Sequence, residues 1–462
     1  MALPPSYDGE PLGDWNSDPE AIPILTDLPA YAPRQRPNAS ALAVRREPKE
    51  FYYEMKRNGK LFASLTMISD AAYSRHMATY LEGAPLKGRV RLTLDKPDAI
   101  LSVVVSVQGQ FITGANEGEQ LTFLHISKTL WSQSEGDPRS GNSPAGGSSS
   151  VAPSTPPKFS GKIQGDYTWP FSIDLPKEVL VPCGNRNEPQ VFTLPETFNE
   201  RHTRASITYD VSVRFVRTKL RADHRIAAKF GFIPIIRPPP FPPLRRLAYQ
   251  EESPLLGPIG DPDGWHSMDP IKIKARTLNN RHILIDCTLF LAKPLSYTRG
   301  SVIPISLRLI GDDHQALDML SSPKAIVARL RRRIKYHHKS VESLAWRDSL
   351  DHSQLALWWP SAEQSEQRGV RYVNGELHLR ADIKPTAAMA SFRIEYSVVL
   401  FSFDSPGLDL GSTEMLIEQP VNIVTAFASG PRARMYAPPG YESEIPVQEV
   451  SNVRSLADLV FF

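Results

Sequence analysis

Short apolar runs, separated by clusters of turn-forming residues, recur along most of the chain. RVRLTL (89–94), ILSVVVSV (100–107) and LTFLHIS (121–127) are rich in the residue types that favour β-strands. The clearest alternation lies in ASITYDVSVRFV (205–216). Side chains two residues apart in a strand share a face. This segment therefore predicts a strand with one buried face, formed by Ile207, Tyr209, Val211, Val213 and Phe215.

A second strand-rich region extends from residue 271 to residue 426. Its strongest segments are RHILIDCTLFLA, GSVIPISLRLIG, FRIEYSVVLFSF and EQPVNIVTA. Two such regions predict an all-β fold of two tandem immunoglobulin-type β-sandwich domains. We place these domains at residues 49–235 and 265–428.

The segments between and around these regions are rich in proline, serine and glycine. The chain holds 42 prolines among 462 residues, and proline is tolerated poorly inside helices and central strands. We expect flexible tails at residues 1–48 and 429–462 and a flexible insert at 132–158. Residues 236–264, which contain RPPPFPPLRR, predict a semi-extended linker between the two domains.

The two regions also resemble each other. Ile207-Thr-Tyr209-Asp-Val211 matches Ile394-Glu-Tyr396-Ser-Val398, and the segment that begins at Gly88 matches the one that begins at Gly300. The matched segments are further apart in the first region, by about the length of the insert at 132–158. A duplicated sandwich with an insertion in its first copy accounts for this, although alternating strands also resemble each other by chance.

Two matches to the pattern PPxY lie near the ends of the chain. They are Pro4-Pro5-Ser6-Tyr7 and Pro438-Pro439-Gly440-Tyr441. Consecutive prolines favour the polyproline II helix, which docks into the aromatic groove of a WW domain. Because both matches lie in expected tails, we predict two WW-binding sites, formed by Pro4, Pro5, Tyr7, Pro438, Pro439 and Tyr441.

A dense basic run lies between Lys324 and Lys339. Its charged residues include Arg329, Arg331, Arg332, Arg333 and Lys335. In a strand, Arg329, Arg331 and Arg333 would project from one face and Arg332 from the other. Such a patch suits acidic cargo or anionic lipid. An equally good interpretation is a solvated edge strand, whose charges prevent aggregation.

Composition and the remaining motifs argue against several other classes. The net charge of +3 gives no sign of nucleic-acid binding. Cys183 and Cys287 match no metal or redox spacing and suggest a reducing compartment, and the first residues carry no secretory signal pattern. His337-His338 has no further ligand at metal spacing. No catalytic signature is present, so we expect a non-enzymatic protein without metal or cofactor.

Taken together, these segments resemble the arrestin family, and the fungal α-arrestins in particular. The resemblance rests on APLKGRVRLTL (84–94), YTWPFSIDLP (167–176), LPETFNERHTRASITYDVSVRF (194–215) and SYTRGSVIPISLRL (296–309), and it extends over roughly residues 50–428. The insert at 132–158 and the linker at 236–264 depart from a minimal arrestin.

The resemblance implies an adaptor. α-Arrestins recruit HECT-type ubiquitin ligases through PPxY motifs and engage the cytosolic tails of membrane transporters or receptors, which are then ubiquitinated and internalised. It implies a cytoplasmic protein peripheral to the plasma membrane and endosomes. An arrestin-fold sorting or pH-signalling scaffold of retromer-like type, acting without a ligase, is the alternative. An enzyme or carbohydrate-binding module on a β-sandwich is disfavoured.

Overall fold

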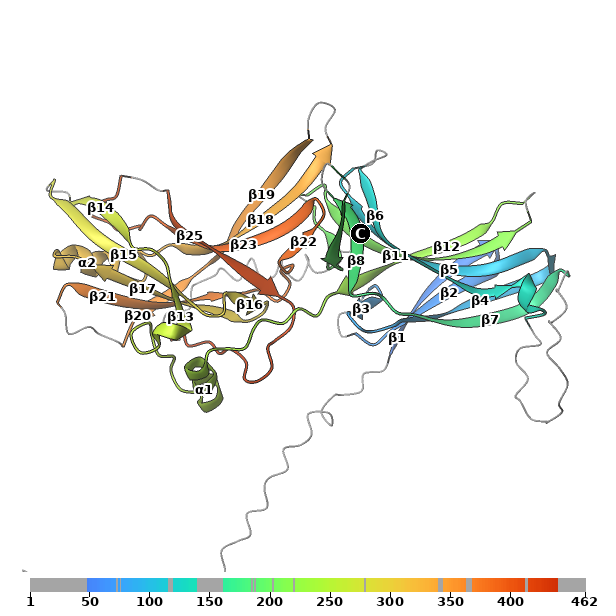
Figure 1. Ribbon diagram of the computed structural model, residues 1–462, viewed down its shortest axis with the longest axis horizontal. Helices are drawn as coiled ribbons and strands as arrows, with labels where there is room; N and C mark the ends of the chain where they lie inside the picture. The colour runs from blue at the N-terminus through green and yellow to red at the C-terminus, as the bar shows by residue number, and fades with distance from the viewer. Residues whose placement is uncertain are drawn as a thin grey trace, which may run out of the picture. The chain divides into compact units, whose positions relative to one another are not determined.

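The computed structural model describes residues 48–438, apart from 72–73, 75, 115–118, 139–160, 184–185, 187, 202, 219–220, 278–279, 340–343, 363–367 and 412–413. The described residues contain β-sheets and two short α-helices (Figure 1). The predicted all-β fold of two tandem β-sandwiches is confirmed. We call them the N-terminal and C-terminal sandwich.

The N-terminal sandwich is built from two sheets and a separate ribbon. One sheet has the order β1-β2-β4-β7, with strands Lys49–Arg57, Lys60–Ser69, Leu86–Asp98 and Ile163–Ile173. The other has the order β3-β12-β11-β5-β6, with strands Thr79–Leu81, His224–Ile233, Ser206–Arg217, Ile100–Ile112 and Gln120–Ser132. Three short strands complete it: β10 (Phe198–Asn199) beside β11, and the ribbon of β8 (Glu178–Cys183) and β9 (Glu188–Thr193). A 3₁₀ turn, η1 (Gln133–Glu135), follows β6.

The C-terminal sandwich repeats this plan. One sheet has the order β20-β21-β17-β15-β14-β24, with strands Leu357–Pro360, Val370–His378, Val302–Ile310, His282–Ala292, Ile271–Thr277 and Leu408–Asp409. The other has the order β16-β25-β23-β18-β19, with strands Ser296–Thr298, Met415–Val424, Phe392–Phe401, Ala328–Lys339 and Leu344–Leu355. The remaining elements are β13 (Trp265–Ser267), β22 (Ala387–Met389), α1 (Pro243–Glu251), α2 (His314–Leu320) and η3 (Pro262–Gly264).

Alternation along the strands accounts for the core. Strand β11 buries every second residue from Ile207 to Phe215, which confirms the face predicted from the sequence. The apolar faces of both sheets meet in a continuous cluster that includes Leu65 and Val90 from one sheet and Val105 and Val211 from the other. Burial of apolar area is the main stabilising term in such a core.

The two sandwiches share one topology, which supports the internal repeat. In each, a short strand at the edge of a sheet runs parallel to its neighbour: β3 to β12, and β16 to β25. In each, a buried tyrosine donates a hydrogen bond to an upstream carbonyl oxygen: Tyr209 to Pro195 at 2.7 Å and Tyr396 to Lys384 at 2.6 Å. Such tyrosine corners recur in immunoglobulin-type folds.

The structure corrects one pairing in the internal repeat, the alignment of Gly88 with Gly300. Gly88 lies inside β4, whereas Gly300 lies in the turn between β16 and β17, with φ of +76°. The counterpart of Gly300 is Gly83, which lies between β3 and β4 with φ of +80°. Only glycine adopts this backbone region at little cost. The alternating pattern fits several registers equally well, and the turn geometry selects one of them.

Residues 236–264 also differ from the predicted semi-extended linker, because they include α1 and η3. The dense run of prolines ends at Pro243, which occupies the first turn of α1. A proline fits there because the first turn needs no N–H donor. The following residues, LRRLAYQE, contain no proline and continue the helix, which buries Arg245, Ala248 and Tyr249.

Candidate functional site

Most of the predicted WW-binding residues lie outside the part of the chain that the structure describes. This holds for Pro4, Pro5, Tyr7, Pro439 and Tyr441. Pro438 is the last described residue, and it is half-buried in a segment without regular secondary structure.

The chain that leads to Pro438 is held on the C-terminal sandwich. The backbone N–H of Tyr436 donates to Glu376 Oε1 at 2.6 Å, and that of Ala437 lies 3.4 Å from Glu376 Oε2. The Tyr436 ring stacks on Tyr249 of α1, with centroids 6.3 Å apart and planes at 16°. Arg434 donates to the Tyr249 carbonyl at 3.2 Å. These contacts bring the start of the second PPxY match to a defined place beside β21 and α1.

The buried carboxylate of Glu376 gave no signal in the sequence. Its side chain is 2% exposed, and His378 Nε2 lies 3.1 Å from Oε2. A buried carboxylate is costly unless hydrogen-bond donors satisfy it, and here backbone N–H groups from residues 60 positions away do so. From the sequence alone, an isolated glutamate in an alternating strand is expected to face solvent. Only the folded structure shows that Glu376 holds the backbone at Tyr436 and Ala437.

The basic run forms strand β18, but the structure does not present it as an open positive surface. Arg329, Arg331, Arg332, Arg333 and Lys335 are all half-buried. The strand pairs with β23 on one side and β19 on the other, so the interpretation as a solvated edge strand is wrong.

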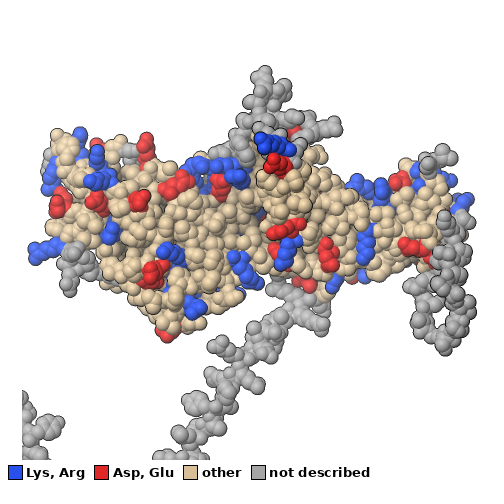
Figure 2. All heavy atoms as spheres, in the orientation of Figure 1, with Lys and Arg blue, Asp and Glu red and all other residues tan. Residues whose placement is uncertain are grey.

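Ion pairs engage Arg331, Arg332 and Lys335 of this strand. Arg331 pairs with Glu418 at 2.9 Å and Lys335 with Glu395 at 3.0 Å. Arg332 makes a bidentate pair with Glu200, at 2.8 and 2.9 Å. Figure 2 shows basic and acidic side chains intermixed over the visible face, without a large field of one sign. Paired cations attract an anion far less than unpaired ones.

Ion pairs join the two sandwiches. Arg332 of β18 pairs with Glu200, which follows β10 of the N-terminal sandwich, and a second group lies nearby in sequence. Glu196, close to β10, accepts from Arg299 at 2.8 Å and from Lys384 at 3.0 Å. All three side chains are at most 15% exposed. Bidentate and partly desolvated pairs of this kind are stronger and more specific in geometry than exposed ones.

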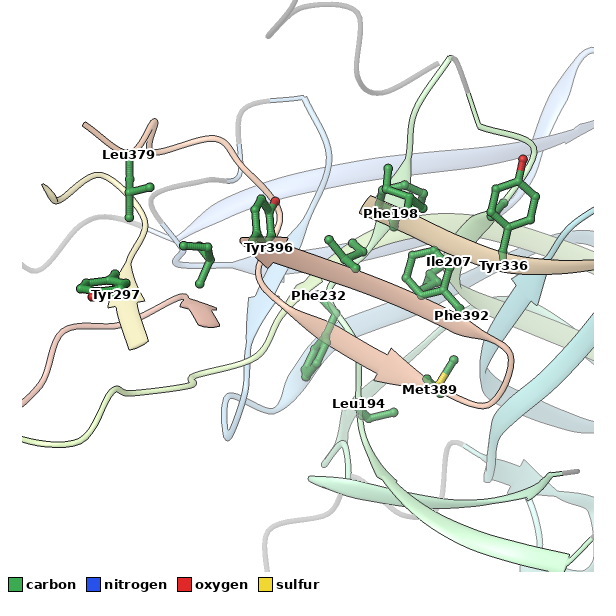
Figure 3. Packing of buried hydrophobic residues seen from close by; sticks show 14 of the residues in the cluster. Leu194, Phe198, Ile207, Phe232, Tyr297, Tyr336, Leu379, Met389, Phe392 and Tyr396 are labelled. Carbon is green, nitrogen blue, oxygen red and sulfur yellow. The ribbon is translucent and has the colours of Figure 1, made fainter. Parts of the chain in front are cut away.

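Aromatic rings pack beside these ion pairs. Phe392 of β23 lies 5.1 Å from Phe198 of β10 and 5.5 Å from Phe111 of β5, measured between ring centroids. Figure 3 shows Phe392 with Phe198, Ile207 and Tyr336 around it. Burial raises the pKa of Tyr396, which lies on the same strand and keeps its proton at physiological pH. The zone is suited to holding two sheets together and brings no nucleophile, base and acid into one place.

Three further features of the described residues concern metal binding, membrane spans and cavities. No group of three histidine, cysteine, aspartate or glutamate side chains there could hold a metal ion. None of the helices in the described ranges is long and apolar enough to cross a membrane. A cavity between α1, β16 and residues 427–433 admits about 20 Å³, which is close to the space for one water molecule.

Comparison with known proteins bears on the N-terminal sandwich. Residues 70–236 match the family model described as arrestin (or S-antigen), N-terminal domain. This range begins after β2 and ends after β12. A search of curated proteins finds no match to the chain. The match supports the arrestin family through residues 70–236, and the C-terminal sandwich repeats the topology of this matched region.

Proposed function

We propose that the protein is an arrestin-type adaptor that recruits a WW-domain ubiquitin ligase of the HECT type to membrane transporters or receptors. The observation that carries the proposal is the presence of two PPxY motifs, one at each end of a pair of arrestin-like sandwiches. In this role the protein does no chemistry itself. It promotes ubiquitination and endocytosis of its cargo from the cytoplasmic side of the plasma membrane and endosomes.

Each motif supplies a short ligand of modest strength. The consecutive prolines favour polyproline II geometry before binding, and Tyr7 and Tyr441 fill a neighbouring pocket of the WW domain. Two motifs on one chain raise the effective concentration of the second binding event when the ligase has several WW domains. The gain reaches about 10²–10⁴-fold over a single contact.

The anchored segment before the second motif supports this arrangement. Because Glu376 holds the backbone of Tyr436, the motif starts from a defined point on the C-terminal sandwich. The sandwiches themselves are proposed to engage the cytosolic tails of the cargo. The basic run of Arg329, Arg331, Arg332, Arg333 and Lys335 is retained only as a secondary candidate for acidic cargo or lipid, because ion pairs to Glu418, Glu200 and Glu395 neutralise part of its charge.

The test compares co-purification of a ligase that has several WW domains. The double variant Tyr7→Ala/Tyr441→Ala is expected to lose the ligase, and each single variant to retain a weakened interaction. Tyr52→Ala is the matched control, because Tyr52 is an exposed tyrosine outside both motifs, with 63% of its surface accessible. The control is expected to behave as the wild type.

Undiminished recovery of the ligase with the double variant would contradict the proposal. Recovery of a stoichiometric coat complex without any WW-domain protein would instead favour the arrestin-fold sorting scaffold.

A further inference from the structure

The proline-rich segment before α1 presents a regular face to solvent that the proposed function does not use. It reads RPPPFPP over residues 237–243. Pro238 is buried and Phe241 and Pro242 are half-buried, whereas the remaining residues are exposed: Arg237, Pro239, Pro240 and Pro243. Figure 1 shows α1 and the chain leading into it on the outside of the C-terminal sheets. Three of the exposed residues, Arg237, Pro240 and Pro243, are spaced by three along the chain, and so are the two that are covered most by the protein, Pro238 and Phe241.

A spacing of three is the signature of a polyproline II helix, which has three residues per turn. Residues i, i+3 and i+6 then share one side. Pro242 has φ of −53° and ψ of 151°, close to the ideal values for this helix. The other side of the segment faces the protein: Phe241 packs edge-on against Tyr249, with ring centroids 5.1 Å apart and planes at 72°. Pro238 lines the same small cavity as this tyrosine.

Both ends of the segment are fixed. At its start, Ile236 N donates to Thr425 Oγ1 at 2.8 Å, and Arg237 Nη1 donates to the Phe427 carbonyl at 2.7 Å. At its end, the buried guanidinium of Arg245 donates to the Gly264 carbonyl at 2.9 Å and stacks over the Trp265 ring at 5.0 Å. The segment is thus ordered before any partner arrives, which removes much of the entropic cost of binding an extended peptide.

We infer that residues 237–243 form a docking site for an SH3 domain. Such domains bind PxxP ligands in polyproline II form in an aromatic-lined groove. Here the proline pairs Pro239-Pro240 and Pro242-Pro243 stand three residues apart, and each pair has an exposed second proline. Pro238 and Phe241, between and before the pairs, are covered by the protein. Arg237 and Arg246 are exposed at the two ends, so the groove that fits this segment has an acidic flank.

The spacing of the prolines favours an SH3 domain over a WW domain. Neither proline pair has a tyrosine at the position that PPxY requires. Pro242 occupies this position after Pro239-Pro240, and Arg245 occupies it after Pro242-Pro243. In addition, α1 extends the apolar surface, because Leu244 and Leu247 are 45% and 47% exposed. Exposed leucines beside a proline ledge enlarge the apolar contact with a partner.

The test measures binding of the full-length chain to a set of isolated SH3 domains that accept Arg-x-x-Pro-x-x-Pro ligands, by isothermal titration calorimetry. At least one domain is expected to bind. Pro240→Ala/Pro243→Ala is expected to weaken that binding at least about tenfold, as for removal of central anchors. Arg237→Glu is expected to weaken it as well and to reduce its dependence on salt, with Arg246 still in place. The thermal midpoint of each variant shows whether it remains folded, and the two variants change different side chains.

Two controls separate this site from the terminal motifs. Pro270→Ala changes an exposed proline outside the segment and is expected to leave SH3 binding unchanged. Tyr7→Ala/Tyr441→Ala is expected to leave it unchanged too, so a failed WW interaction does not affect this result. The inference is overturned if none of the SH3 domains binds, if the double proline variant binds as tightly as the wild type, or if a WW domain rather than an SH3 domain binds the segment.

Discussion

One buried carboxylate in the N-terminal sandwich offers a sharp test of the energetics. Asp98, at the end of β4, accepts a hydrogen bond at Oδ2 from Arg217 Nη2. Arg57 Nη1 lies 3.3 Å from Oδ2, and Arg221 Nη1 lies 3.3 Å from Oδ1. The side chains of Asp98 and Arg217 are both 6% exposed, whereas Arg57 and Arg221 are at least half exposed. The buried cation therefore depends on this one carboxylate far more than the two exposed ones do.

Asp98→Asn removes the charge and keeps the shape of the side chain. It leaves Arg217 buried with a neutral neighbour, and removing one partner of a buried pair costs about 3–5 kcal/mol. For a domain of 150–250 residues, 1 kcal/mol corresponds to about 2–4 °C in the melting temperature. We therefore expect the transition of the N-terminal sandwich to fall by about 6–20 °C.

Differential scanning calorimetry of the full chain is the appropriate assay, because it records separate transitions if the two sandwiches melt apart. Asp95→Asn is a matched control on the same strand. Asp95 pairs with Lys60 at 2.8 Å, but the two side chains are 59% and 77% exposed, so water screens their interaction. We expect this control to melt as the wild type does. A loss below about 1 kcal/mol in Asp98→Asn, or an equal loss in both variants, would refute the reasoning.

Two further predictions concern the same sandwich. A Cβ atom on Gly88 would lie 2.3 Å from the Thr66 carbonyl oxygen and 2.6 Å from Phe171 Cζ. Gly88→Ala is therefore expected to lower the free energy of unfolding by about 1–3 kcal/mol, measured by urea unfolding. An unchanged urea midpoint would contradict the clash. Burial acts to raise the pKa of Asp98, but the hydrogen bond and charge of Arg217 outweigh it and hold the pKa below its usual value. The resulting stabilisation is present above a pH of about 4 and is lost as the pH falls through the lower pKa of the folded state. As the pH is lowered, the urea midpoint of the wild type is expected to fall more steeply than that of Asp98→Asn. Parallel plots of midpoint against pH would contradict this.

The alternation of apolar and polar residues was informative wherever the feature to be predicted lies within a single strand. The alternation from Ile207 to Phe215 predicted the buried face of β11, because a period of two is a property of the strand itself. The same pattern could not set the relation between the two repeats, since any shift by two residues preserves it. The turn glycines Gly83 and Gly300 resolve that relation through their positive φ angles.

Composition was less reliable where a segment changes character midway. Proline density suggested one extended linker over residues 236–264, yet the run of closely spaced prolines ends at Pro243 and a helix begins there. The extended part that remains is ordered by contacts with Thr425 and Phe427, which are almost 200 residues away. No local signal in the sequence connects these segments.

The sequence by itself determined the strand-rich character of both regions, the apolar face of β11 and the positions of the two PPxY motifs, because each of these depends on residues close together in the chain. Tertiary structure alone decided which charges and side chains are accessible. Arg332 reads as an unpaired cation until Glu200, 132 residues earlier, pairs with it. Glu376 likewise reads as a surface residue until Tyr436 donates to it. Ion pairs and burial depend on distances between segments, and only the folded chain sets those distances.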